Sequence, residues 1–246
     1  FQDAPVIMEQ RRETEANPEN NCESYNRAKL VKSAREHDVP IVRFEACHDG
    51  VSQKEGMEMD DQMFGGLAKT LEISEHARVL ITANLAVDHG LMNGTQGVVK
   101  QIVYPARSEG PNAIDPSQRL PCAIVVDCPK YDGPAFYDGP ERRTWVPIQP
   151  RTGRSEDDKD VERTQFPLVL GWALTPWKAQ GMTLDKAIVR LGSRAGEPGV
   201  AFVALSRVRH PDDLMLEDDF PPMAAIQRQK RTHGYARRNS GSDDSE

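Results

Sequence analysis

The sequence predicts a layered α/β domain that is interrupted by a small antiparallel β-barrel. Helix and strand patterns alternate near the start of the chain and again after residue 164, as in folds where helices cover a parallel sheet. Between them, short apolar runs are separated by turns that contain Gly and Pro, which is typical of a small barrel. We therefore expect a discontinuous α/β domain, residues 24–76 and 164–222, with the barrel inserted as residues 77–163.

The first part of the α/β domain is expected to contain one helix and one strand. Residues 1–23 are polar, and we expect them to be poorly ordered. Ser24 is a candidate N-cap for a helix whose apolar residues recur at helical spacing, namely Ala28, Leu30, Val31 and Ala34. Asp38 and Pro40 end this helix, and residues 41–47 have the pattern of a strand.

The inserted segment is expected to contain four strands and a long loop. The strand patterns, separated by turn residues, lie at residues 79–83, 98–104, 123–127 and 145–148. The charged stretch 151–163 has no hydrophobic periodicity, so we expect a loop there.

After the insertion the α/β pattern returns. An apolar stretch at 167–175 leads into a Lys-Ala-Gln-Gly turn, and residues 187–191 have the pattern of a strand. Pro198 and Gly199 open a helix that carries Val200, Val203, Ala204 and Val208, and residues 214–216 form a last strand. Residues 223–246 are basic and then acidic, and we expect them to be disordered.

The composition excludes several classes of protein. The longest apolar run, residues 168–174, is far shorter than the roughly 20 residues that cross a membrane, so no membrane partner is expected. The four cysteines lack zinc-ligand spacing, which favours free thiols in a reducing, intracellular compartment and no metal site within the chain. Because the first residue is Phe1 and not Met, we expect a fragment of a longer product.

The charge is unevenly distributed along the chain. The net charge of -7 does not indicate a general nucleic-acid binder, but acidic residues cluster around 156–160 and at the C-terminal end. Between these clusters lies a locally basic stretch, made by Lys178, Lys186, Arg190, Arg194, Arg207 and Arg209. A protein that grips single strands in a channel needs such local positive charge and not a basic average.

Two patterns imitate parts of a nucleotide site. Residues 65–70 end in Lys-Thr as a phosphate-binding loop does, but Ala68 stands where the loop needs a glycine and no apolar strand precedes it. Residues 123–127 resemble a strand that ends in a magnesium-binding Asp, but no second acid follows. We expect an ordinary loop and an ordinary barrel strand.

The most informative residues follow the apolar stretch 167–175. In residues 175–183, Lys178 supplies a point charge for phosphate, Gln180 a donor and an acceptor, Gly181 a close backbone approach and Thr183 a hydroxyl. Taken alone, this stretch could equally be a solvated loop. About twenty residues later, Arg207 ends an apolar helical run, a placement suited to an arginine finger on a phosphoryl group, although a surface ion pair is the commoner role of a single Arg.

Taken together and in order, these stretches resemble superfamily 1B DNA helicases of the PIF type (petite integration frequency), which are related to the bacterial RecD subunit. The matching stretches are residues 25–30 (after motif IV), 77–81 with 84–85 and 90–99 (the start of a Src-homology-3-like insertion), 166–186 (motif V) and 202–209 (motif VI). The resemblance extends over about residues 24–220.

The resemblance implies a RecA-like second domain of a P-loop NTPase helicase, with a parallel sheet and an inserted Src-homology-3-like barrel. ATP and Mg²⁺ would be held mainly by an N-terminal RecA-like domain of the same protein, so the chain alone is expected to be inactive. The family translocates 5′ to 3′ on single-stranded or forked DNA. It couples ATP hydrolysis to DNA repair, recombination and telomere maintenance, in the nucleus or the mitochondrion.

The resemblance also implies roles for individual residues. Arg207 would be catalytic and reach the γ-phosphate, and the remaining nucleotide-binding residues would be Gln180, Gly181 and Thr183. The DNA-binding residues would be Thr175, Trp177, Lys178 and Asn93. Trp177 stands where the family usually has His, so it either stacks on a base or only packs. A non-enzymatic module that binds single-stranded nucleic acid, encoded by a shortened gene, and an RNA helicase remain as alternatives.

Overall fold

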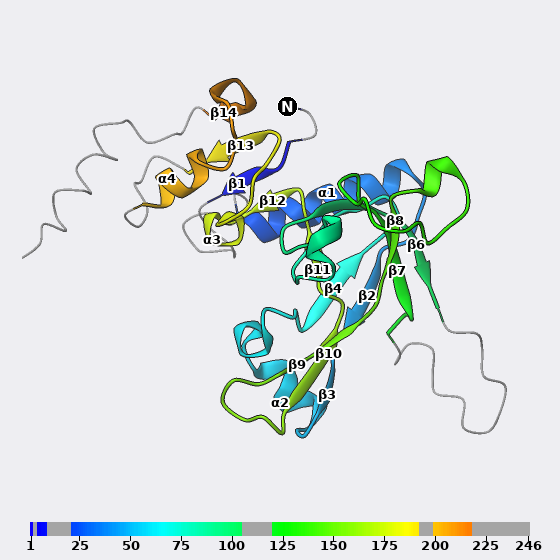
Figure 1. The fold of residues 1–246 in the computed structure, drawn as a ribbon. Coiled ribbons are helices and arrows are strands. Elements are labelled where there is room, and N and C mark those ends of the chain that lie inside the picture. The colour runs from blue at the N-terminus through cyan, green and yellow to red at the C-terminus, as the bar shows by residue number, and fades with distance from the viewer. Residues whose placement is uncertain (2–3, 9–20, 105–119, 192–198, 218–246) are drawn as a thin grey trace, which may run out of the picture. The chain divides into compact units, whose positions relative to one another are not determined.

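The computed structural model describes residues 1, 4–8, 21–104, 120–191 and 199–217. It divides into two compact units. We call residues 1–9 and 175–246 the terminal unit and residues 10–174 the central unit, and their elements are labelled in Figure 1. The expected disordered tail, residues 223–246, lies outside the described residues.

The terminal unit contains a parallel sheet, as the sequence predicted. Its strands β1 (Val6–Met8), β13 (Ala187–Arg190) and β14 (Leu214–Leu216) pair in parallel in the order β1-β13-β14. Two short helices, α3 (Pro176–Ala179) and α4 (Val200–Leu205), belong to the same unit. The core combines both helices and the strands, through Ile7, Ala179, Leu184, Ala187, Val189, Leu191, Val200 and Ala204.

Strand β1 lies within the segment that was expected to be poorly ordered. All three of its residues are buried, and Val6 is in register with Ile188 of β13. A strand buried on both faces is a continuous apolar run without alternation. Three residues of that kind, followed by a long polar stretch, give too short a pattern to be recognised in the sequence.

The central unit begins with helix α1 (Cys22–Glu36), whose N-cap is Asn21 and not Ser24 as expected. The Asn21 side chain accepts a hydrogen bond from the backbone N–H of Ser24 at 2.9 Å. Asn is as good an N-cap as Ser, and the helix starts one turn earlier than the apolar periodicity indicated. Its buried residues are Cys22, Asn26, Leu30 and Ala34.

The central unit contains a five-stranded antiparallel sheet in the order β11-β5-β6-β7-β8. Its strands are β5 (Arg78–Ile81), β6 (Gln96–Val103), β7 (Ala123–Asp127), β8 (Trp145–Ile148) and β11 (Leu168–Leu170). The four expected strands are therefore present, β7 and β8 with the expected bounds. Strand β11, expected in the α/β domain, pairs instead with β5. The described pairings leave β11 and β8 at the edges, so closure into a Src-homology-3-like barrel stays a prediction.

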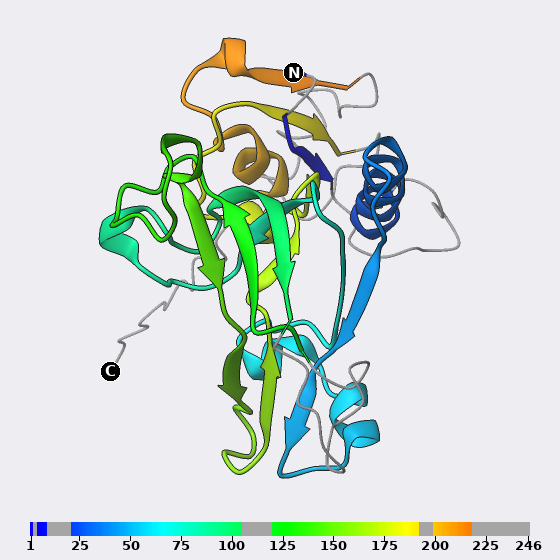
Figure 2. The same ribbon diagram turned by 90° about the vertical axis from the view of Figure 1, so that its right-hand side faces the viewer.

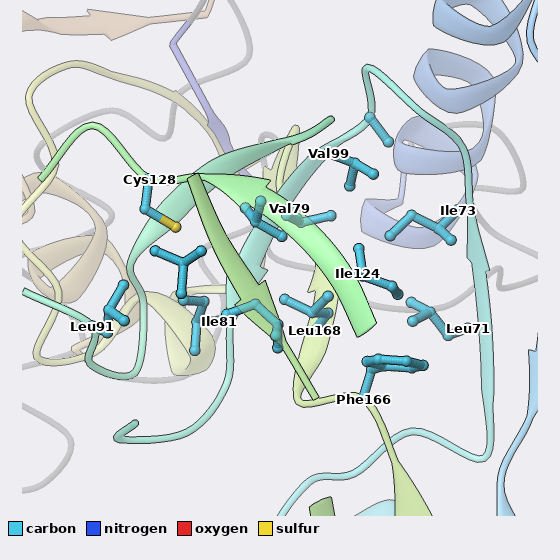
Figure 3. Close-up of a cluster of buried hydrophobic side chains, with 14 of the residues drawn as sticks. Leu71, Ile73, Val79, Ile81, Leu91, Val99, Ile124, Cys128, Phe166 and Leu168 are labelled. Carbon is cyan, nitrogen blue, oxygen red and sulfur yellow. The ribbon is translucent and has the colours of Figure 1, made fainter. Parts of the chain in front are cut away.

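The core of the central unit is formed by the inward-facing residues of this sheet and its neighbours. In β5, Val79, Leu80 and Ile81 are all buried, and Val79 and Ile81 belong to this core. Figure 3 shows them beside Leu71, Ile73, Leu91, Val99, Ile124, Cys128, Phe166 and Leu168. Leu71 and Ile73 belong to β4 (Thr70–Ile73), which pairs antiparallel with β2 (Val42–Glu45). Another short strand of this unit is β12 (Ala173–Leu174).

The charged stretch 151–163 is not a loop throughout, which corrects the sequence prediction. Strand β9 (Arg151–Arg154) pairs antiparallel with β10 (Glu162–Gln165), and β10 pairs with β3 (Cys47–Asp49). Helix α2 (Gln53–Glu58) lies beside them, at the lower end of the central unit in Figures 1 and 2. The pattern gave no signal because the buried side chains of β10 are polar, namely Arg163 and Gln165.

Arg163 organises this lobe, which we define as residues 47–69 and 151–165. Its side chain is 0% exposed. Its Nε donates to His48 Nε2, and its two Nη atoms donate to Asp61 Oδ1 and to backbone carbonyls, those of Gly56, Met59 and Leu67, at 2.8–3.0 Å. All five guanidinium N–H donors can thus be used, which is what a buried charge requires.

Candidate nucleotide and nucleic-acid site

Residues 175–183 form a short helix and a turn in the terminal unit. Thr175 is the N-cap of α3, and its hydroxyl accepts a hydrogen bond from the Lys178 backbone N–H at 3.4 Å. Pro176 follows at the first helical position, where its missing N–H costs nothing. Thr175 is buried, whereas Trp177 is 56% exposed and Lys178 is exposed. The cap therefore holds the helix, and the two residues after Pro176 face outward.

The turn after α3 exposes the predicted nucleotide-binding residues. Gln180, Gly181 and Thr183 are all exposed, and Gln180 is the C-cap of the helix. Gly181 has a φ of 79°, in the left-handed region that favours glycine. A Cβ added there would meet no atom within 4 Å. The sequence suggested glycine for close backbone approach, but in this structure the backbone conformation is what requires it.

Arg207 follows helix α4, as the sequence predicted, and bonds back to the turn after α3. Its Nη1 donates to the carbonyl oxygens of Ala179 at 3.3 Å and Met182 at 3.2 Å. Its Nε donates to the Val203 carbonyl at 2.7 Å, and its Nη2 donates to Ser206 Oγ at 2.6 Å. The side chain thus joins the end of α4 to residues 179–182.

The backbone of the same arginine adds a second tie. The Leu184 N–H donates to the Arg207 carbonyl at 2.8 Å, and Leu184 itself is buried in the core of the terminal unit. Residues 179–184 and 203–207 are therefore held together by both side-chain and main-chain bonds. The Arg207 guanidinium is partly buried, and four of its five N–H donors form the side-chain hydrogen bonds described above.

These partners of Arg207 were not predicted from the sequence. The bond to Val203 has the i to i−4 spacing of one helical turn, so it was open to prediction from the position of Arg207 just after the helix. The bonds to Ala179 and Met182 span 28 and 25 residues, and no sequence pattern signals them.

Asn93 belongs to the central unit, in the turn between β5 and β6. Its side chain is exposed, and its backbone N–H donates to the Asn84 side chain at 3.0 Å. The next residue, Gly94, has a φ of 92°, so this turn also needs glycine. The structure thus presents the Asn93 amide at the surface of the central unit.

The two imitation sites have structural roles. Gly65 is the left-handed C-cap of a 3₁₀ turn (Asp61–Phe64), and Lys69 leads into strand β4 and not into a helix. Asp127 accepts a hydrogen bond from Thr144 and pairs with Lys100 at 3.3 Å. Among the described residues, no three His, Cys, Asp or Glu gather as metal ligands, and no helix is long and apolar enough to cross a membrane.

Known proteins similar to this chain are DNA helicases. No family model matches it. The ATP-dependent DNA helicase PIF6 of Trypanosoma brucei brucei is 33% identical over 180 residues, 73% of this chain and 20% of that protein. Human ATP-dependent DNA helicase PIF1 is 31% identical over 172 residues, 69% of this chain and 22% of that protein. The chain thus spans about a fifth of the length of these curated relatives.

Solved structures give the same fold. The Pif1 helicase of Candida albicans superimposes with a TM-score of 0.55 at 22% identity, covering 92% of this chain and 49% of that one. A Bacteroides sp Pif1 in complex with ADP-AlF4 superimposes with a TM-score of 0.54 at 21% identity, covering 95% of this chain and 47% of that one. This similarity, together with the mixed α/β structure and the parallel sheet of the present chain, supports a RecA-like fold.

Proposed function

The chain is homologous to the PIF1-family ATP-dependent DNA helicases. We propose that it is the second RecA-like domain, with an inserted β domain, of a helicase of this family. The whole protein would translocate 5′ to 3′ on single-stranded or forked DNA at the expense of ATP. Its work would be DNA repair, recombination and telomere maintenance in the nucleus or the mitochondrion. An N-terminal RecA-like domain of the same protein would supply the phosphate loop and most of the ATP and Mg²⁺ ligands.

The main support for this proposal is the attachment of Arg207 to residues 179–182. A motor must connect the site where ATP is hydrolysed to the site where DNA is held. In this chain the predicted finger, Arg207, bonds directly to the carbonyls of Ala179 and Met182, which flank Gln180 and Gly181. The same turn follows the helix that exposes Trp177 and Lys178. A movement of the Arg207 side chain would therefore alter the hydrogen bonds that hold the turn next to the residues proposed to contact DNA.

The proposed chemistry is positioning and charge stabilisation. When Mg²⁺ and ATP are bound by the other domain, they supply the polarised phosphoryl group. Arg207 would then exchange its carbonyl partners for the γ-phosphate, because a phosphate oxygen is a stronger acceptor for a guanidinium than a neutral carbonyl. Ala179 and Met182 would lose their donors, and the turn that carries Gln180, Gly181 and Thr183 would be free to move.

The DNA side of the site divides between direct contact and support. We assign Lys178 to a phosphate of the strand and Trp177 to stacking on a base, since both are exposed on α3. Thr175 is buried and caps the helix, so it would act by positioning these two residues. Asn93 would contact the strand from the central unit.

The first test uses the 246-residue chain alone. It should bind single-stranded DNA but not hydrolyse ATP, because its sequence contains no phosphate loop of the G-x-x-x-x-G-K-[ST] form. Steady ATP turnover by the purified chain would contradict the assignment to a second domain. Failure to bind single-stranded DNA at low salt would contradict the nucleic-acid side of the proposal.

The second test examines Arg207 in a protein that contains this chain together with a phosphate-loop domain. Arg207→Ala should lower the DNA-stimulated ATP turnover by roughly 10³–10⁵, the range for arginine fingers. Arg209→Ala is the matched control, since Arg209 is exposed and forms no hydrogen bond or ion pair among the described residues. Equal turnover in the two variants would remove Arg207 from the mechanism.

A further inference from the structure

We infer that Arg151 forms, with Asn93, a second contact point for a nucleic-acid phosphate, and that Asn84 is the residue that positions both. The inference rests on the proposed function and deepens it by naming a binding site in the central unit. Arg151 is the first residue of β9 and lies in the stretch that was expected to be a loop, where no sequence pattern indicated a binding residue.

Asn84 joins the two groups through two different atoms. Its side-chain Oδ1 accepts a hydrogen bond from the Asn93 backbone N–H at 3.0 Å. Its backbone carbonyl accepts a hydrogen bond from Arg151 Nη1 at 3.2 Å. Asn84 and Arg151 are 67 residues apart, and all three residues are exposed. The fold therefore brings one guanidinium and one free amide to the same exposed place.

The turn that carries Asn93 is held firmly. The Gly94 N–H donates to the Ile81 carbonyl at 2.7 Å, which attaches the turn to β5. Thr95 Oγ1 accepts from the Met92 N–H at 3.0 Å and donates to the Gly90 carbonyl at 2.9 Å. Asn93 thus projects from a braced turn, and its side chain forms no hydrogen bond within the described residues. The turn therefore positions the Asn93 amide before a ligand binds.

Arg151 differs from its neighbour on the same strand in being left without a carboxylate. Arg154 pairs with Glu162 at 2.8 Å, whereas Arg151 has no ion pair in the described part of the chain. Its one anchored Nη1–H restricts the guanidinium and leaves the other donors free. A planar donor group that is anchored and not neutralised is well suited to a phosphate, which it can bind through two parallel bonds.

The ligand that fits this site is the phosphodiester backbone of a single strand. Contacts to phosphate come from Arg and from amide side chains, and they fix the position of the strand without reading its sequence. Met92, 43% exposed and next to Asn93, adds apolar surface of the kind that a sugar can cover. An acidic peptide would use the same donors, and the experiment separates the two.

The test measures the affinity of the 246-residue chain for a fluorescent oligothymidylate at several salt concentrations. Arg151→Ala should weaken binding roughly tenfold, the effect of one lost charge-assisted hydrogen bond. It should also lower the slope of log affinity against log salt by about 0.7, the value for one single-strand phosphate. Arg151→Lys should keep the slope, and Arg154→Ala, the matched control on the same strand, should leave both quantities unchanged.

Asn84→Ala tests the positioning role. It removes Oδ1 but keeps the carbonyl that anchors Arg151 and changes no charge, so it should weaken binding while leaving the salt slope as in the unchanged chain. Circular dichroism and melting temperature establish that each variant is folded.

Each outcome decides between the claims. If the unchanged chain does not bind the oligonucleotide, the proposed function fails. If it binds and Lys178→Ala weakens binding while Arg151→Ala does not, the proposed function stands and this inference is wrong. Equal losses for Arg151→Ala and Arg154→Ala would show a diffuse charge effect and overturn the site. If polyglutamate bound more tightly than the oligothymidylate, and this binding depended on Arg151, the assignment to nucleic acid would be wrong.

Discussion

Replacing Arg163 by alanine should destabilise the central unit far more than replacing any exposed arginine of the same sheet. The side chain is 0% exposed and pairs with Asp61, whose side chain is 11% exposed. Alanine would leave the Asp61 carboxylate, two buried backbone carbonyls and one partly buried carbonyl without this donor. Breaking one partner of a buried ion pair costs about 3–5 kcal/mol, because the remaining charge is desolvated and unpaired.

Urea unfolding followed by circular dichroism measures this loss as the change in the free energy of unfolding. The matched control is Arg154→Ala on the neighbouring strand β9. Its ion pair with Glu162 is open to solvent, with side chains 71% and 31% exposed, so its loss should cost no more than about 1 kcal/mol. The double variant Arg163→Met with Asp61→Leu should recover part of the loss, since it leaves no unpaired buried charge. A cost below about 1 kcal/mol for Arg163→Ala would refute the role given to this network.

Two further perturbations probe the same unit. Burial lowers the pKa of His48, with the charge of Arg163 acting in the same direction and the hydrogen bond to Gln53 opposing both. The neutral ring is therefore the native form, its contribution to stability is complete above the ordinary pKa of about 6.5, and it is lost as the pH falls through the lower folded value. Urea unfolding from about pH 7.5 to about pH 5.5 should show a falling free energy of unfolding, and His48→Gln should make this fall shallower. A profile that His48→Gln leaves unchanged would contradict this. Asn26→Leu should cost about 2–3 kcal/mol in the same assay, because Asn26 bonds to both the N–H and the carbonyl of Ala173, and a loss within error would show that these groups find other partners.

The sequence predicted those parts of the fold that depend on apolar periodicity. Strands β7 and β8 have the expected bounds because both are short runs between turn residues. Strand β7 is a continuous apolar run that is buried up to Asp127, and β8 alternates between half-buried and buried residues. Helix α4 and the position of Arg207 just after it were also predicted. These elements are encoded locally, so a single sequence suffices to find them.

The elements that sequence reasoning missed are held by polar or distant contacts. Strand β10 is stabilised by a buried arginine, and a pattern of apolar residues cannot reveal a strand whose buried side chains are polar. Strand β1 pairs with a strand about 180 residues away. The partners of Arg207 and the bond between Arg151 and Asn84 likewise depend on the folded chain, not on spacing.

On the proposed function, Arg207 leaves its carbonyl partners to reach a nucleotide held by another domain. The most direct test of this movement is a crystal structure of a protein that joins this chain to a phosphate-loop domain, with ADP, aluminium fluoride and single-stranded DNA bound. We expect the Arg207 guanidinium within about 2.7–3.2 Å of the fluoride that replaces the γ-phosphate, and no longer bonded to Ala179 and Met182. A guanidinium that remains on those two carbonyls, or that points into solvent in the closed state, would contradict the account.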